Sequence, residues 1–371
     1  MRKRILWLTG ILLGLLAGLL FLHPYWQPSL LILDAAGPQG LIGRLPEWAG
    51  RSVRTEDVDV PTRSGKIPGR IYVPSGSPRA AVVVVHGLHA AGIAEERLGP
   101  FARKVAARGI VVLTPEMEDL RRYRITPQTT DQIEDSTRWL ANEQRFATKG
   151  RVGLIGISFS GGLSIVAAGR SSIRDRVLFV LSLGGHGDLY RTAHYLCTGQ
   201  LPEGRGYLKP HDYAVAVVLL NLCDRLVPDS QSRQLADGIT AFLHEDNELG
   251  HRMIQQLPQP SSQILGWVEA RDASKLAPMM LPHLVQFASD PNLSPERSAP
   301  PVAPVFLLHG EGDSLIPSSE TESLARYLRG KTEVHWLITP LIFHVQLDQR
   351  PKFRDVWNLL RLWERIFRIM G

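Results

Sequence analysis

The sequence predicts an α/β fold, a mostly parallel sheet flanked by helices. Short runs of apolar, often β-branched residues alternate with amphipathic helical stretches over most of the chain, a pattern typical of strand–helix–strand units. One of these strands turns into a helix through a group of small residues, 156–162. The alternation is interrupted once, by a long helical stretch, and then resumes. A chain of 371 residues can form one large domain of this kind and still hold an insertion.

The first 22 residues predict a membrane anchor. Basic residues at positions 2–4 precede an almost unbroken apolar run, Ile5 to Leu22. This run is at the short end for a membrane span and longer than a typical signal-peptide core. No Ala-x-Ala-like cleavage site follows, and His23-Pro-Tyr-Trp-Gln-Pro28 supplies two aromatic residues typical of a membrane interface. We therefore expect an uncleaved transmembrane helix, with a cleaved signal peptide as the alternative.

The placement of charge gives an expected location. With basic residues on the cytoplasmic side, a single-pass anchor leaves the rest of the chain on the non-cytoplasmic side, and cleavage would make it secreted or periplasmic. The formal net charge is +6, of which residues 2–4 supply three. The remaining +3 is close to neutral for a chain of this size. The sequence therefore gives no reason to expect a nucleic-acid partner.

The first half of the chain contains a hairpin and then alternating elements. Residues 23–50 are rich in Pro and Gly and are expected to be a tether with short helical pieces. Val53–Val60 and Ile67–Val73 predict an antiparallel hairpin. The elements expected after it are strand 81–85, helix 94–108, strand 110–113, helix 128–145, strand 152–156, helix 162–170 and strand 177–183.

A helical insertion divides the predicted core. Residues 186–300 lack the strand–helix rhythm and are expected to form a cap, with helices near 213–227 and 232–244. The alternation resumes with strand 304–309, helix 318–329, strand 333–338 and a final helix at 351–369. The expected organisation is therefore an anchor (1–22), a tether (23–50), a core in two parts (51–185 and 301–371) and the cap (186–300) between those parts.

Residues 156–162, Gly-Ile-Ser-Phe-Ser-Gly-Gly, form the most informative motif. Apolar residues before it predict a strand, and residues 163–168 after it predict a helix. A strand that turns sharply into a helix around a serine is typical of a nucleophile elbow, where neighbouring bulk would clash across a strained turn. Gly156, two positions before it, favours Ser158 as the nucleophile. Ser160 remains the alternative, because it stands where a second glycine is usual.

Three further motifs accompany this turn. Val82–Leu88 is a strand that runs into His-Gly, and Val305–Pro317 is a strand followed by His-Gly-Glu-Gly-Asp-Ser-Leu-Ile-Pro. Leu341–His344 follows the last predicted strand. With these motifs in this order, the chain from about residue 53 to its end, apart from the insertion, resembles the α/β-hydrolase family. The expected fold is therefore the α/β-hydrolase fold with a helical cap insertion.

The resemblance implies a set of catalytic residues. Ser158, Asp313 and His344 would form a triad in the chain order that this fold uses. The backbone N–H groups of Leu88 and Phe159 would form the oxyanion hole, in which losing one donor costs on the order of 3–4 kcal/mol. Serine needs a base to accept its proton. Histidine can be that base near neutral pH, and an aspartate fixes its tautomer.

Two other aspartates compete for the role of the acid. Asp224 lies in Asp-Arg-Leu-Val-Pro, which is similar to residues 313–317, but it follows a stretch that predicts a cap helix. Asp188 follows the strand after the elbow, a position that some family members use. The strand and the His-Gly that precede Asp313 favour it over both.

The expected function is that of a serine hydrolase, which cleaves an ester or related acyl bond through an acyl-enzyme, in the manner of carboxylic ester hydrolases. The alternatives are a small serine peptidase of the same fold and a non-catalytic α/β-hydrolase-like binding protein. The expected partners are a small-molecule or lipid-like acyl substrate and the membrane.

The sequence predicts neither a cofactor nor a metal site. The triad is sufficient for the chemistry, and His86 and His89 lack a third ligand for zinc. Cys197 and Cys223 could pair if the domain is exported, or remain buried thiols.

Overall fold

The computed structural model describes residues 23–36, 41–342 and 352–371. The predicted membrane anchor, residues 1–22, and the predicted catalytic base, His344, both fall outside these ranges. Among the helices within them, none is long and apolar enough to cross a membrane.

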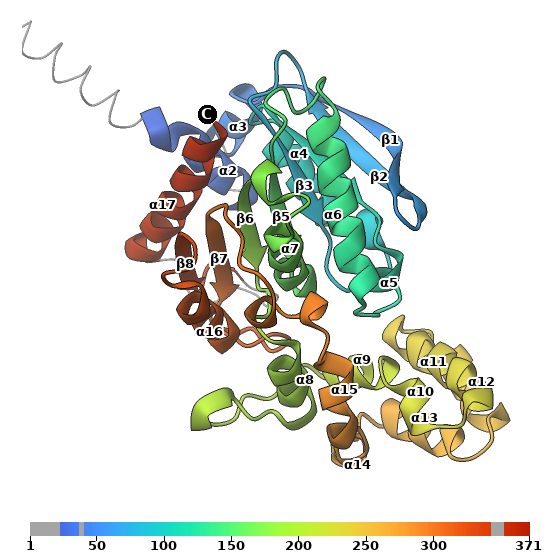
Figure 1. The fold of residues 1–371 in the computed structure, drawn as a ribbon. Helices are drawn as coiled ribbons and strands as arrows, with labels where there is room; N and C mark the ends of the chain where they lie inside the picture. The colour runs from blue at the N-terminus through green and yellow to red at the C-terminus, as the bar shows by residue number, and fades with distance from the viewer. Residues whose placement is uncertain (1–22, 37–40, 343–351) are drawn as a thin grey trace, which may run out of the picture.

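The core is one eight-stranded sheet with the order β1-β2-β4-β3-β5-β6-β7-β8 (Figure 1). β1 and β2 form the predicted hairpin, β2 is antiparallel to β4, and the pairs from β4 through β8 are parallel. The strands are β1 (Val53–Thr62), β2 (Gly65–Pro74), β3 (Ala80–Val85), β4 (Ile110–Pro115), β5 (Val152–Ile157), β6 (Val177–Leu183), β7 (Val305–Gly310) and β8 (Val334–Thr339).

Helices cover both faces of the sheet because its central strands are apolar on both sides. Val82 and Val84 of β3 pack with α4 and α17, whereas Val83 and Val85 pack with α6 and α7. The helices of the core are α2 (Trp26–Ala36), α3 (Leu41–Trp48), α4 (Leu98–Ala106), α5 (Glu118–Arg121), α6 (Pro127–Asn142), α7 (Phe159–Gly169), α16 (Ser319–Leu328) and α17 (Phe353–Met370), with 3-10 turns η1 (His23–Tyr25), η2 (Gly92–Ala94) and η3 (Arg174–Arg176).

The stretch before the hairpin contains the expected short helices, and one of them packs on the core. Leu30 and Leu31 of α2 are 1% and 3% exposed. α2 lies beside α4 and α17, so that the first described segment packs against the last helix of the chain. This part of residues 23–50 therefore belongs to the folded body.

Residues 189–297, between β6 and β7, form the helical insertion. Figure 1 shows it beyond the carboxyl ends of the parallel strands, at the opposite end of the molecule from α2. Its helices are α8 (Leu189–Thr198), η4 (Pro202–Gly204), α9 (Ala214–Leu220), α10 (Cys223–Leu226), α11 (Asp229–Leu243), α12 (Asn247–Gln256), α13 (Ser261–Glu269), α14 (Ala273–Met280), η5 (Leu281–His283), α15 (Leu284–Ala288), η6 (Pro291–Leu293) and η7 (Pro295–Arg297).

The helix predicted at 213–227 is two shorter helices, α9 and α10, with a break at Asn221. The Asn221 side chain accepts a hydrogen bond from the N–H of Ile125 (2.9 Å) and donates one to the carbonyl oxygen of Tyr123 (2.9 Å). Asparagine side chains favour such bonds to backbone groups over helix continuation. The break therefore joins the insertion to the core.

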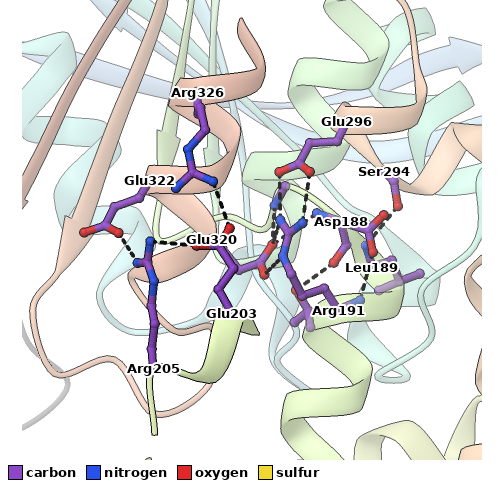
Figure 2. Close-up of polar contacts among 12 residues, drawn as sticks. Asp188, Leu189, Arg191, Glu203, Arg205, Ser294, Glu296, Glu320, Glu322 and Arg326 are labelled. Carbon is purple, nitrogen blue, oxygen red and sulfur yellow. Dashed lines mark hydrogen bonds and ion pairs between the residues drawn. The ribbon is translucent and has the colours of Figure 1, made fainter. Parts of the chain in front are cut away.

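An ion-pair network joins the two ends of the insertion to each other and to the core (Figure 2). We call it the root network. Arg191 of α8 pairs with Glu296 of η7 (2.7 Å) and with Glu320 of α16 (2.6 Å). Glu320 is fully buried and also accepts hydrogen bonds from the N–H groups of Gly187 (2.9 Å) and Asp188 (3.1 Å). A buried carboxylate with this many donors is well compensated for its lost hydration. The network thus fixes the root of the insertion to the core.

The root network predicts a difference between two glutamates of one helix. We expect Glu320→Ala to lower the free energy of unfolding by about 3–5 kcal/mol, because it removes one of the two carboxylate partners of Arg191 and leaves the N–H groups of Gly187 and Asp188 without their acceptor. Glu322→Ala, which removes only an ion pair with Arg205 near the surface, should cost less than about 1 kcal/mol. Urea denaturation of the purified variants measures both values. Equal losses would contradict a structural role for Glu320.

Candidate active site

The turn between β5 and α7 has the geometry of a nucleophile elbow. Ser158 stands between the strand and the helix with φ 58° and ψ −132°, a backbone conformation that is rare for a residue with a side chain. Its N–H donates to the carbonyl oxygen of Leu183 (2.7 Å), and its own carbonyl oxygen accepts from Gly161 (2.8 Å). These bonds hold the strained turn between the end of β5 and the end of β6.

The small neighbours of Ser158 are required by close contacts. A Cβ at Gly156 would lie 2.3 Å from the carbonyl oxygen of Ser160, and one at Gly162 would lie 2.5 Å from Cε1 of His186. Both distances are too short for any real Cβ. The glycines therefore allow α7 to start directly beside the end of β5.

The two candidate serines differ in what their hydroxyl groups do. Ser160 is fully buried, and its Oγ accepts from the N–H of Ile157 (2.8 Å) and lies 2.9 Å from the carbonyl oxygen of Val85, to which it can donate. The Ser158 side chain is partly exposed, and its hydroxyl has no hydrogen-bond partner among the described residues. This geometry favours Ser158 as the nucleophile and gives Ser160 a structural role.

Asp313 lies in the loop after β7 and is oriented by its surroundings. Its Oδ1 accepts from the N–H groups of Leu315 (2.8 Å) and Ile316 (3.0 Å), and its Oδ2 lies 3.6 Å from Nε2 of His309. Burial alone would raise the pKa of Asp313, but the nearby ring N–H of His309 and the two backbone amides outweigh it and keep that pKa below its ordinary value. Asp313 is thus an ionised carboxylate at neutral pH.

His309 orients this loop, a role that the sequence analysis did not assign. Its ring is fully buried; Nε2 donates to the carbonyl oxygen of Ile316 (2.8 Å), and Nδ1 accepts from the hydroxyl of Thr321 (2.7 Å). Tyr195 of α8 adds a hydrogen bond to the carbonyl oxygen of Ser314 (3.1 Å). In the sequence, the His-Gly pair before Asp313 indicated the loop that carries the acid. It did not indicate that His309 would contact Ile316 and Thr321.

The structure brings Ser158 and Asp313 to the same edge of the sheet, on either side of β6. The N–H of Ser158 bonds to Leu183, the last residue of β6, and a Cβ at the following Gly184 would lie 3.3 Å from Oδ2 of Asp313. The backbone before His344 also reaches this edge, since a Cβ at Gly310 would lie 2.4 Å from the carbonyl oxygen of Ile342. His344 itself, two residues further on, lies outside the described residues.

The loop after β3 lies against the elbow. A Cβ at Gly87 would lie 3.2 Å from Cβ of Ser158, so the glycine lets Leu88 follow close to the serine. Within the described ranges, no acceptor is found for the backbone N–H groups of Leu88 and Phe159. An oxyanion hole would require two such donors on the segments that meet at Ser158.

The histidines near this loop have structural partners. Nε2 of His86 accepts from the N–H of Met117 (3.0 Å), and Nδ1 can donate to the carbonyl oxygen of Gly87 (2.8 Å). His89 is exposed. Within the described part of the chain, no cluster of His, Cys, Asp or Glu could hold a metal ion, and Cys197 and Cys223 are unpaired buried thiols.

The two rival aspartates occupy other environments. Asp188 caps α8 by accepting from the N–H of Arg191 (2.8 Å) and pairs with Arg297 (2.7 Å), so it is part of the root of the insertion. Asp224 is exposed on α10. Neither carboxylate accepts hydrogen bonds from two consecutive backbone N–H groups, as that of Asp313 does.

A groove of about 580 Å³ lies elsewhere, at the other end of α7. Gly169 and Arg170 line it, about 16 Å along an α-helix of this length from Ser158. Four of its charged side chains pair with one another: Arg63 and Arg170 each contact Asp131 and Glu134. This groove is therefore separate from the candidate active site.

Comparisons with known proteins support the fold. No protein-family model and no curated protein sequence matches the chain. A ligand-bound form of the rice cell wall degrading esterase LipA from Xanthomonas oryzae is 16% identical, over 84% of this chain and 87% of that one, with a TM-score of 0.51. A mutant of the same esterase is 14% identical, over 83% of this chain and 87% of that one, also with a TM-score of 0.51.

A longer enzyme also matches in part. An acylaminoacyl peptidase in complex with a chloromethyl ketone is 15% identical over 86% of this chain, with a TM-score of 0.47. This chain covers only 41% of that peptidase's length. Together, the sheet order and the similarity to the LipA structures identify the α/β-hydrolase fold.

The close contacts at the elbow predict an effect of one added methyl group. We expect Gly156→Ala to lower the free energy of unfolding by about 1–3 kcal/mol, because its Cβ would overlap the backbone at Ser160. Gly266→Ala in α13 is the control: nothing lies within 4 Å of the new Cβ, so this change should be neutral or stabilising. Thermal and urea unfolding measure the stability of both variants. Equal stability would contradict the conclusion that the turn leaves no room for a side chain at position 156.

The lowered pKa of Asp313 predicts a pH-dependent contribution to stability. Because the folded-state pKa lies below the ordinary value of about 3.9, the ionised carboxylate stabilises the folded state above about pH 4. This contribution is lost as the pH falls through the folded-state pKa. Asp313→Asn should therefore be less stable than the wild type at neutral pH, with a difference that shrinks in acid.

Urea denaturation at a series of pH values measures this difference. Asp224→Asn, at an exposed site, is the control and should change stability by no more than about 0.5 kcal/mol at any pH. A penalty for Asp313→Asn that stays constant into acid would show that the carboxylate charge is not what stabilises the loop.

Proposed function

We propose that the protein is a serine hydrolase that cleaves an ester or related acyl bond through a triad of Ser158, His344 and Asp313. The observation that carries this proposal is the backbone of Ser158, held at a positive φ with a partly exposed hydroxyl to which no other described residue hydrogen-bonds. Such strain is expensive, about 1–3 kcal/mol, and is typical of functional positions. A purely structural turn would favour glycine at this position.

The proposed reaction has two halves. Oγ of Ser158 attacks the carbonyl carbon of the substrate while His344 takes the hydroxyl proton. The tetrahedral intermediate collapses, His344 gives the proton to the leaving group, and an acyl-enzyme remains. Water then attacks the acyl carbon with the same base, which releases the acid and restores Ser158.

The surroundings of Ser158 support the other roles. Asp313, ionised and held by backbone amides, would accept a hydrogen bond from His344, fix its tautomer and stabilise its protonated form. The N–H groups of Leu88 and Phe159 would bind the oxyanion. Because these donors are fixed before the reaction, they stabilise the transition state without reorganisation.

The helical insertion would act as the cap over this site. The N–H of His211 donates to the carbonyl oxygen of Ser314 (3.0 Å), one residue after the proposed acid. Residues 211–213 of the insertion therefore border the acid loop. We propose a small-molecule or lipid-like acyl compound as the substrate; the small peptidase remains the alternative, without an observation that favours it.

We further propose that residues 1–22 anchor the chain in a membrane, with the hydrolase on the non-cytoplasmic side. This part of the proposal rests on the apolar run from Ile5 to Leu22 and the basic residues before it.

A fluorophosphonate probe tests the catalytic proposal. The full chain, purified in detergent, should form a covalent adduct that mass spectrometry maps to Ser158. Ser158→Ala should fold, lose the adduct and lower kcat on an acyl ester by about 10⁴-fold or more. Ser171→Ala, at an exposed serine, is the matched control and should keep both.

Two outcomes would contradict this assignment. An adduct on Ser160 would mean that Ser160, and not Ser158, is the nucleophile. A folded wild-type chain without any adduct, and without esterase activity, would support the non-catalytic binding protein instead.

A further inference from the structure

Three aromatic side chains form a stack where the described chain begins. The ring of Tyr25 in η1 stacks on Trp357 of α17, with centroids 5.4 Å apart and planes 27° apart. Trp357 stacks in turn on Phe353, one helical turn earlier, at 6.4 Å and 11°. We call Tyr25, Trp357 and Phe353 the aromatic stack. It joins the start of the described chain to the first turns of the last helix.

The outer part of the stack is exposed to solvent. Phe353 is 82% exposed, and Trp26, next to Tyr25, is 53% exposed. By contrast, Trp363 and Phe367 of the same helix are buried in the core. Burying a side chain as large as phenylalanine is worth about 1.5–3 kcal/mol, so a partner that covered these exposed rings would gain binding free energy.

Exposed basic side chains lie close to the stack in the chain. Lys352 and Arg354 flank Phe353 and are exposed, and Arg361 is exposed one turn beyond Trp357. The acidic residues of α17 are less available, since Asp355 is half-buried and Glu364 is buried and paired with Arg368. An apolar aromatic surface with a basic rim is complementary to an anionic lipid surface, where each cation adds about 1 kcal/mol.

The position of the stack in the chain limits its distance from a membrane. The apolar run ends at Leu22, and η1 begins at the next residue. Three residues span at most about 11 Å, so Tyr25 lies within that distance of the end of the run. The headgroup region on each side of a bilayer is about 5–8 Å thick. If the run spans the bilayer, the stack therefore begins within the headgroup region or a few ångströms beyond it.

We propose that the aromatic stack, with Trp26 and the basic residues around it, docks the folded body in the headgroup region of an anionic bilayer. This inference rests on the proposed anchoring of residues 1–22. Tyrosine and tryptophan favour this region because their rings are apolar and their polar atoms reach water. The lipid surface would cover Phe353, while the nearby cations would bind phosphate groups.

A fluorophore at position 353 of the full chain tests the docking. Phe353→Cys supplies one accessible thiol, because the two native cysteines are buried, and burial raises the pKa of both thiols to about 12. The NBD-labelled chain is reconstituted in vesicles of phosphatidylcholine and phosphatidylglycerol that contain a nitroxide lipid labelled near the headgroup. We expect blue-shifted NBD emission and strong quenching by the nitroxide.

Tyr207→Cys is the matched control. Tyr207 is also an exposed aromatic residue, 67% exposed, but it lies in the helical insertion, between η4 and α9. Its label should be quenched several-fold less than the label at position 353. Because both positions are exposed, neither substitution should affect folding, which thermal unfolding of the labelled chains verifies.

The possible failures are distinguishable. If the wild-type chain is released from vesicles by alkaline carbonate, the anchoring fails and the docking fails with it. If the chain is retained but positions 353 and 207 are quenched equally, the docking alone is wrong. Blue-shifted emission at position 353 without quenching would also overturn it, because the stack would then be covered by protein, such as a second copy of the chain.

Discussion

The close approach of α7 to β5 is the constraint on which the candidate site depends. Ser158 can hold its strained backbone only because Gly156 and Gly162 leave room for the first turn of the helix. The strain is compensated by the hydroxyl of Ser160, which bonds to the end of β5 and lies within reach of the end of β3, and by the bond from Ser158 to Leu183 in β6. Three strand ends thus meet at this turn, where the Ser158 hydroxyl has no hydrogen-bond partner within residues 23–36, 41–342 and 352–371.

A second constraint holds the insertion to this edge of the sheet. Glu320 begins α16 shortly after the loop of Asp313, and through Arg191 it joins that loop to both ends of the insertion. Tyr195 and His211, both in or near the insertion, bond to Ser314 beside the acid. The proposed cap and the loop of the proposed acid are therefore held by the same contacts. A movement of the cap would displace the loop that carries Asp313.

The parts of the fold and of the candidate site that were predictable from the sequence are those that depend on neighbouring residues in the chain. The parallel strands follow from β-branched runs, and the elbow follows from the glycines on either side of Ser158. The break at Asn221, the orienting role of His309 and the burial of Glu320 were not predictable, because each depends on partners far away in the chain: Gly187 and Glu320, for example, are separated by 133 positions. The role of His344 remains a prediction, since it lies outside the described residues.

The packing of α2 links the two ends of the molecule. The Pro- and Gly-rich composition of residues 23–50 predicted a tether, yet Leu30 and Leu31 are buried and Tyr25 stacks on Trp357. A long flexible linker would let the domain rotate freely above a membrane. Here the apolar run would pass directly into a segment fixed to α17, which packs on the same sheet that carries Ser158 and Asp313. Anchoring would therefore fix not only the distance of the site from the bilayer but also its orientation.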